Sequence, residues 1–98
     1  MAVRFGLLVT LQAQEGQSDA LAAFLERGRA IAAEESRTVT WYAFQVDGTT
    51  FGVFDTFETV EGRQEHLSGR IPAALGEVGA DLLAREPEIR PVDIVAAL

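Results

Sequence analysis

Several stretches of the chain alternate apolar and polar side chains with the period of two that is typical of β-strands, and two of them are apolar on both faces. In the segment 51–57, Phe51, Val53 and Phe57 share one face, while Phe54 lies on the other. The segment 39–46 is also apolar on both sides, with Tyr42, Phe44 and Val46 on one face and Val39, Trp41 and Ala43 on the other. The helices of a small sheet cover only one face, so the second face predicts a second copy of the chain packed against it.

The first elements along the chain are a strand and a helix. Every odd position from Val3 to Leu11 is apolar, which predicts a strand. Ser18 is placed to cap a helix, and apolar residues recur at helical spacing until the helix ends near Ser36.

A β-hairpin follows the first helix. Residues 37–46 and 50–57 are both strand-like, and Asp47-Gly48 between them is a dipeptide typical of hairpin turns. These two strands are therefore predicted to be antiparallel neighbours.

The last third of the chain predicts two helices and an edge strand. Thr59 is placed to cap a short helix, and Gly69 to end it in the left-handed conformation. Pro72 suits the first position of a third helix. Residues 88–95 form the last strand, and Pro91 places it at a sheet edge because proline cannot donate to a central ladder.

The element order is therefore β-α-β-β-α(α)-β, which predicts an α+β fold of the ferredoxin-like, split βαβ type. Residues 1–98 are expected to form a single domain with a four-stranded antiparallel sheet and helices on one face. The bare faces of two such sheets would pack together in a homodimer.

Charge and missing residue types narrow the function. Fifteen acidic residues against eight arginines give a net charge of −7 and a pI near 4.5, so the chain lacks the basic face that nucleic acid requires. It contains no Cys and no Lys, which excludes thiol and Schiff-base chemistry. His66 is the only histidine, so one chain cannot build a multi-histidine metal centre. The sequence shows neither a membrane span nor a signal peptide, so we expect a cytoplasmic protein.

One region of the sequence resembles a known family. The strand Phe51-Gly-Val-Phe-Asp-Thr-Phe57 ends in an acid, a small polar residue and an aromatic, and the next ten residues end in the pair His66-Leu67. This pattern resembles the antibiotic biosynthesis monooxygenase family of dimeric α+β barrels, whose motif positions match Asp55, Thr56, Phe57, His66 and Leu67.

The resemblance implies a homodimer with a pocket in each subunit between its sheet and its helices. Characterised members of the family oxidise polycyclic phenols with O₂ without a metal or organic cofactor, degrade haem, or act on small quinones. This chain departs from the oxygenases at two points, because Phe57 stands where they commonly have tryptophan and there is no asparagine anywhere.

Two residues are candidates for catalysis. His66 is the only side chain whose ordinary pKa lies near neutrality, so it is a candidate proton acceptor, or else a histidine bonded to the backbone. Asp55 lies in an aromatic strand, where an acid has a raised pKa or pairs with an arginine or backbone N–H. Arg63 and Arg70 lie near His66 along the chain and either hold an anionic substrate or form surface ion pairs.

Aromatic residues are the candidates for substrate binding. Trp41 and Tyr42 lie on opposite faces of one strand, so only one of them lines a given cavity. Phe54 and Phe57 suit a pocket for a flat apolar molecule, and they equally suit an ordinary core.

The sequence leaves three hypotheses for function. The first is a cofactor-independent monooxygenase-like enzyme that acts on a small aromatic or quinone-like metabolite, in which the substrate supplies the electrons as its phenolate. The alternative is a non-catalytic dimeric barrel that binds a ligand or a partner. The third is haem degradation with His66 as the iron ligand.

Overall fold

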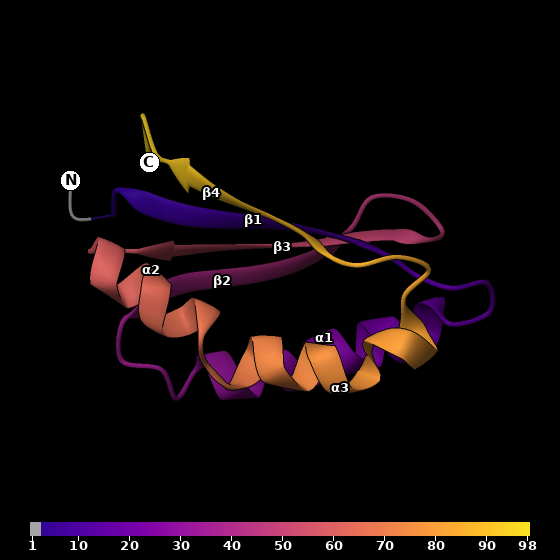
Figure 1. Ribbon diagram of the computed structural model, residues 1–98. Coiled ribbons are helices and arrows are strands. Elements are labelled where there is room, and N and C mark those ends of the chain that lie inside the picture. The colour runs from indigo at the N-terminus through magenta and orange to yellow at the C-terminus, as the bar shows by residue number, and fades with distance from the viewer. Residues whose placement is uncertain (1–2) are drawn as a thin grey trace.

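The computed structural model describes residues 3–98, which contain three helices and four strands. The order along the chain is β1 (Phe5–Gln12), α1 (Ser18–Ala32), β2 (Thr38–Gln45), β3 (Thr50–Phe57), α2 (Val60–Leu67), α3 (Arg70–Leu82) and β4 (Glu88–Asp93). This is the predicted order, and the ferredoxin-like α+β fold class is confirmed (Figure 1).

The four strands form one antiparallel sheet in the order β2-β3-β1-β4. Residues that face one another across the ladders form rows, and one row contains Trp41, Asp55, Leu7 and Pro91. Pro91 lies on an edge strand, as its missing N–H predicts. The row places the acid of β3 directly beside the tryptophan of β2.

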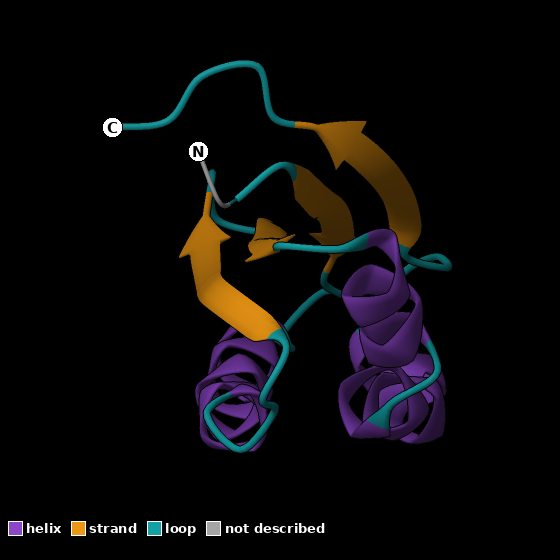
Figure 2. Cartoon of the chain, turned by 90° about the vertical axis from the view of Figure 1, so that its left-hand side faces the viewer, coloured by secondary structure: helices purple, strands orange, loops and turns teal. Residues whose placement is uncertain are grey.

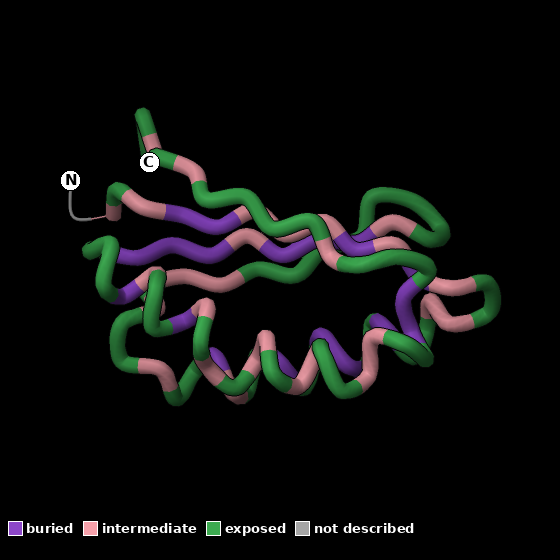
Figure 3. Tube along the Cα trace, in the orientation of Figure 1, coloured by how far each residue is buried: buried purple, intermediate pink, exposed green. Residues whose placement is uncertain are grey.

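All three helices lie on one face of the sheet, so the molecule has two layers (Figure 2). Burial is concentrated on the two central strands and on the helix sides that face them (Figure 3). The buried core cluster between the layers consists of Leu11, Ala13, Leu21, Phe24, Leu25, Phe51, Val53, Leu82 and Leu83. Apolar burial between helices and sheet therefore holds the two layers together.

The opposite face of the sheet carries apolar side chains with no helix over them. Tyr42, Phe54 and Leu8 form a row on this face, and Tyr42 is 61% exposed. Phe44 is 41% exposed and lies over Gly52, where an added Cβ would collide with the phenyl ring. The prediction that these strands are apolar on both faces is confirmed. We call the side of the sheet away from the helices the outer face.

The ends of α1 differ from the prediction. The N-cap is Gln17, and Ser18 is the first helical residue, whose Oγ donates to the Gly48 carbonyl at 2.7 Å instead of capping the helix. The helix ends at Ala32 rather than near Ser36. The N–H groups of Glu34 and Glu35 donate three residues back, to the carbonyls of Ile31 and Ala32, which tightens the last turn and directs the chain towards β2.

The junction between α2 and α3 confirms one expected cap and corrects two others. Thr59 caps α2, because its Oγ1 accepts from the Gly62 N–H at 2.9 Å. Gly69 is not left-handed; its φ is −91°, and it is the N-cap of α3. The third helix begins at Arg70, so Pro72 is its third residue rather than its first. Proline fits there because the N–H groups of a first turn have no partner within the helix.

The hairpin and the last strand are close to the prediction. β2 and β3 pair antiparallel, and the loop between them is held by Asp47, whose Oδ1 accepts from the N–H groups of Thr49 and Thr50 at 3.0 and 2.9 Å. These bonds, with that from Thr49 the stronger, lower the pKa of Asp47. β4 ends at Asp93, two residues earlier than predicted.

Candidate functional site

His66 is a buried histidine near the end of α2. The helix lies beneath one end of the sheet, with His66 and Gly62 as its two buried residues (Figure 1). The side chain of His66 is only 7% exposed, and its ring lies 5.4 Å from the ring of Phe57. α2 therefore presents its histidine to the sheet.

Asp55 meets His66 from the sheet. Its side chain is 1% exposed on the helix-facing side of β3, and its Oδ2 lies 2.9 Å from Nε2 of His66. This contact lies outside hydrogen-bond geometry, and among residues 3–98 neither Asp55 oxygen has a hydrogen-bond partner. The contact is an ion pair that leaves the hydrogen-bonding capacity of Asp55 unused.

Glu35 meets His66 from the other side. It lies in the loop after α1, and its Oε1 is 2.6 Å from Nδ1 of His66. The same oxygen accepts from the Thr38 hydroxyl at 2.8 Å, which fixes the carboxylate in place. Glu35 was not among the residues selected from the sequence, because a surface acid 31 positions from its histidine carries no local signal.

The two carboxylates determine the charge of His66. Burial by itself lowers the pKa of the imidazole, but Asp55 and Glu35 outweigh that effect and raise the pKa above its ordinary value of 6.5. The protonated ring donates towards a carboxylate from each nitrogen. The two acids thus favour the imidazolium form of His66.

Asp55 and His66 line a cavity of about 50 Å³ between the sheet and the helices. The other lining residues are uncharged: Leu7, Val9, Leu11, Phe24, Leu25, Trp41, Val53, Leu67, Ile71, Pro72, Leu75 and Ile89. Nε1 of Trp41 is also buried without a hydrogen-bond partner. Two residues that each have a buried polar atom without a hydrogen bond, Trp41 and Asp55, therefore line the same apolar cavity.

The structure brings some of the predicted site residues together. His66, Asp55 and Trp41 all border the cavity, and Phe57 packs against the imidazole ring. Trp41, not Tyr42, is the aromatic residue of β2 that lines the cavity. The partner of Asp55 is the histidine rather than an arginine or a backbone N–H.

The other predicted residues lie elsewhere. Tyr42 and Phe54 share a row on the outer face. Arg63 lies 5.4 Å from the Phe5 ring centre, and its nearest acceptor is a backbone carbonyl of β4 at 3.2 Å. Arg70 forms an exposed ion pair with Glu34 at 2.9 Å. Neither arginine borders the cavity.

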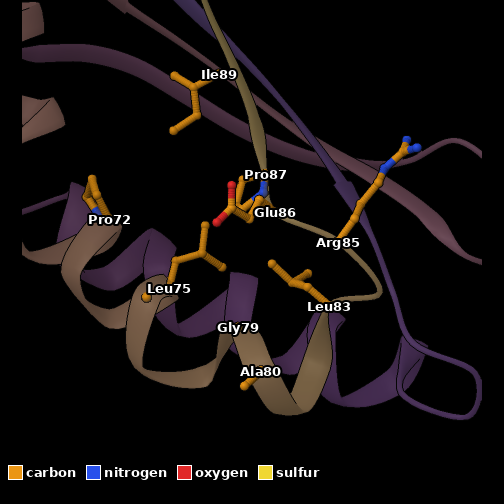
Figure 4. Close-up of a pocket in the computed structure, with 10 residues that line it drawn as sticks. Pro72, Leu75, Gly79, Ala80, Leu83, Arg85, Glu86, Pro87 and Ile89 are labelled. Carbon is orange, nitrogen blue, oxygen red and sulfur yellow. The ribbon is translucent and has the colours of Figure 1, made fainter.

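A larger hollow adjoins this cavity and shares Pro72, Leu75 and Ile89 with its lining, but neither Asp55 nor His66 borders it. It is a groove of about 510 Å³ between α3 and the segment that leads into β4, lined mainly by apolar residues such as Leu75, Leu83 and Ile89 (Figure 4). Arg85 points away from it (Figure 4). We place the candidate site at the smaller cavity, because the buried unpartnered polar groups are there.

Two searches of residues 3–98 are negative. No helix in this part of the chain is long and apolar enough to cross a bilayer. Within the same residues there is no group of three or more His, Cys, Asp or Glu side chains with the arrangement of a metal site.

Comparison with known proteins places the chain by its fold. No protein-family model and no curated protein matches it. Solved structures named "putative antibiotic biosynthesis monooxygenase" do: one from Chloroflexus aurantiacus has a TM-score of 0.75 at 23% identity and covers 97% of this chain and 96% of its own. Another, from Caulobacter crescentus, has a TM-score of 0.80 at 16% identity and covers 97% and 92%. The chain has the fold of these proteins, which confirms the resemblance at the level of the fold.

A further solved structure is similar in sequence as well. It is a protein of unknown function from Nitrosomonas europaea, with 43% identity, a TM-score of 0.96, and coverage of 99% of this chain and 94% of that one. The chain belongs to the same family as this protein.

Proposed function

We propose that this protein is a cofactor-independent, monooxygenase-like enzyme whose substrate is a small hydroxylated aromatic or quinone-like metabolite. The observation that carries the proposal is the buried carboxylate of Asp55 at the wall of an apolar cavity, which pairs with His66 but has no hydrogen-bond partner among residues 3–98. A buried carboxylate without a hydrogen bond is costly, and such groups occur where a ligand or reacting group completes them.

The cavity offers two complementary contacts to such a ligand. The aliphatic and aromatic walls accept a flat apolar ring. The indole N–H of Trp41 can donate to a ligand oxygen, and the carboxylate of Asp55 can accept from a ligand hydroxyl. The side chains of Leu75 and Ile71 on α3 line the opposite wall, so movement of that helix would enlarge the cavity.

The proposed reaction uses electrons from the substrate itself. Asp55 takes the hydroxyl proton, and the phenolate reduces O₂. One oxygen atom forms a bond to a ring carbon, the other leaves as water, and the phenol becomes a quinone. The conversion of one phenol and one O₂ into one quinone and one water balances atoms and electrons without an external reductant.

His66 has a positioning role in this proposal. The sequence suggests His66 as the proton acceptor, but both of its ring nitrogens already face carboxylates. We therefore assign proton acceptance to Asp55, with His66 holding the carboxylate in place. This arrangement also leaves no free nitrogen for haem iron, so haem degradation is not proposed.

Assembly and location remain proposals as well. The apolar outer face supports a homodimer joined sheet to sheet, as in the dimeric barrels that the fold resembles. The expectation of a cytoplasmic protein stays a prediction.

A non-catalytic ligand-binding barrel is the second candidate. It is favoured by the small volume of the cavity and by Phe57, which packs against His66 at 0% exposure and does not line this cavity. In that case the same Trp41 and Asp55 contacts would hold a ligand without consuming O₂.

Oxygen uptake distinguishes the two candidates. Uptake with hydroquinone and 1-naphthol as probes is expected for the native chain, and Asp55→Asn should lower it by about 10²- to 10⁴-fold, the usual contribution of a positioned acid or base. Asp81→Asn, at an exposed position of α3, is the matched control. Trp41→Phe, which removes only the indole donor, tests the site if Asp55→Asn folds poorly.

Each result has a defined meaning. Binding of the probes without O₂ uptake, seen as a change in the fluorescence of the single tryptophan, supports the binding barrel. If neither binding nor uptake occurs, both proposals are wrong.

A further inference from the structure

His66 borders both the cavity of the candidate site and a second hollow, on the surface beside the loop after α1. The hollow has a volume of about 280 Å³ and is lined by Glu34, Glu35, Ser36, Arg37, Thr38, Gly62, Glu65, His66, Gly69 and Arg70. No other residue lines both spaces. The imidazole therefore lies between the cavity and this hollow.

One ring nitrogen of His66 faces the cavity and the other faces the hollow. Nε2 lies 2.9 Å from Asp55, which borders the cavity, and Nδ1 lies 2.6 Å from Glu35, which borders the hollow. Asp55 is 1% exposed, whereas Glu35 is 22% exposed and reaches water. The three groups form a continuous line of titratable side chains from the interior to the surface.

We propose that Glu35, His66 and Asp55 form a proton path between the cavity and the surface, with Glu35 as the outer, positioning residue. The path deepens the proposed function and rests on it for the source of the proton, which is the ligand hydroxyl at Asp55. Glu35 itself touches neither the cavity nor a ligand in it.

The coupling along the path is electrostatic, and protons balance at each step. When Asp55 accepts a proton, the His66 imidazolium loses one of the two negative charges that stabilise it. Nδ1 then releases its proton to Glu35, which passes it to water. One proton enters at Asp55 and a different one leaves at Glu35, so the ring need not rotate. Return of the Asp55 proton to the product, together with uptake of one proton from water through Glu35 at Nδ1, resets the line.

The surrounding charges do not interrupt the path. The remaining lining of the cavity is uncharged. On the surface side, Arg70 pairs with Glu34, and Arg37 pairs with Glu65 at 3.4 Å. Glu35 is thus the acid of the hollow that contacts the histidine.

The test is a stopped-flow pH jump on the full chain without ligand, followed through the fluorescence of Trp41, which faces Asp55 across the ladder. The jump changes the charge of His66, and we expect the fluorescence of the native protein to follow it. In Glu35→Gln, which keeps the shape of the side chain but cannot carry a proton, the relaxation should slow by about a hundredfold. Glu34→Gln removes a neighbouring charge outside the path and should relax at the native rate.

The outcomes of the pH jump do not depend on whether a substrate exists. Equal relaxation rates in Glu35→Gln and Glu34→Gln would overturn the proton path, as would a native fluorescence that ignores pH. Glu35→Asp, which restores the acid, should recover most of the lost rate. Failure of O₂ uptake alone would contradict the proposed function but not this path.

Discussion

At the residue scale, the central feature is a histidine with a carboxylate at each nitrogen. An imidazole in this position has little freedom to exchange partners, because both N–H groups point at acids. The charge of His66 therefore contributes to the stability of the fold as well as to the proposed reaction.

The stability of the protein should fall as the pH rises above neutrality. The folded pKa of His66 is raised above the unfolded value of 6.5, so its contribution to the free energy of unfolding is fully present below pH 6.5. It is lost as the pH rises through the folded pKa. Urea denaturation at several values between about pH 6 and about pH 9 measures this loss.

His66→Gln is the control for this titration. Histidine 66 is the only histidine and there is no cysteine, so few other groups titrate in the same range. The variant should be less stable at pH 6 and should show a flatter dependence on pH. A native profile that is flat or rises over this range contradicts the assigned charge of the pair.

At the element scale, α2 matters most because it carries His66. The helix is only eight residues long, and helices of that length are marginal in isolation. Its position depends on its cap and on the contacts of its histidine.

Removal of the α2 cap should destabilise the site more than a similar change at α1. Thr59→Ala loses the hydrogen bond to the Gly62 N–H and should cost about 1 kcal/mol of folding free energy. Ser18→Ala removes a hydroxyl of similar size that caps no helix and should cost less. Thermal denaturation of the two variants compares them, and equal losses would mean that Thr59 does not stabilise α2 through its cap.

The sequence predicted elements better than it predicted their ends and their contacts. The bounds of β3 were predicted correctly as 50–57, because the Asp47-Gly48 turn fixes where the strand begins and the apolar residues continue to Phe57. The end of α1 was placed four residues late, since the bonds that tighten its last turn leave no mark on apolar spacing. The pattern placed Trp41 and Tyr42 on opposite faces but could not tell which face the helices cover.

The candidate site was predicted in part for the same reason. Asp55 and His66 were visible as an acid in an apolar strand and a lone histidine, but their contact depends on how α2 docks on the sheet. Glu35 joins them only through tertiary structure, from a loop with no motif.

At the scale of the whole molecule, the uncovered outer face is the main unbalanced feature. Its apolar residues lie on a sheet whose three helices are all on the other face. A second copy of the chain would remove this surface from water.

The proposed homodimer should dissociate when a charge is placed on the outer face. Phe44→Glu would bury a carboxylate between the two sheets, so sedimentation should show monomers at concentrations at which the native chain is dimeric. Val60→Glu is the matched control, because Val60 is 42% exposed, close to the 41% of Phe44, but lies on α2. A native chain that sediments as a monomer, or a Phe44→Glu variant that remains dimeric, would contradict this interface.

The docking of α2 has a consequence for turnover in the proposed reaction. The helix buries little besides Gly62 and His66, so the ion pairs of the His66 imidazole provide a large share of the interactions that hold α2 against the sheet. When Asp55 becomes neutral, its ion pair with His66 is lost, and α2 is held less tightly against the sheet. Departure of the product would then be timed by the same proton transfer to Asp55 that began the proposed reaction.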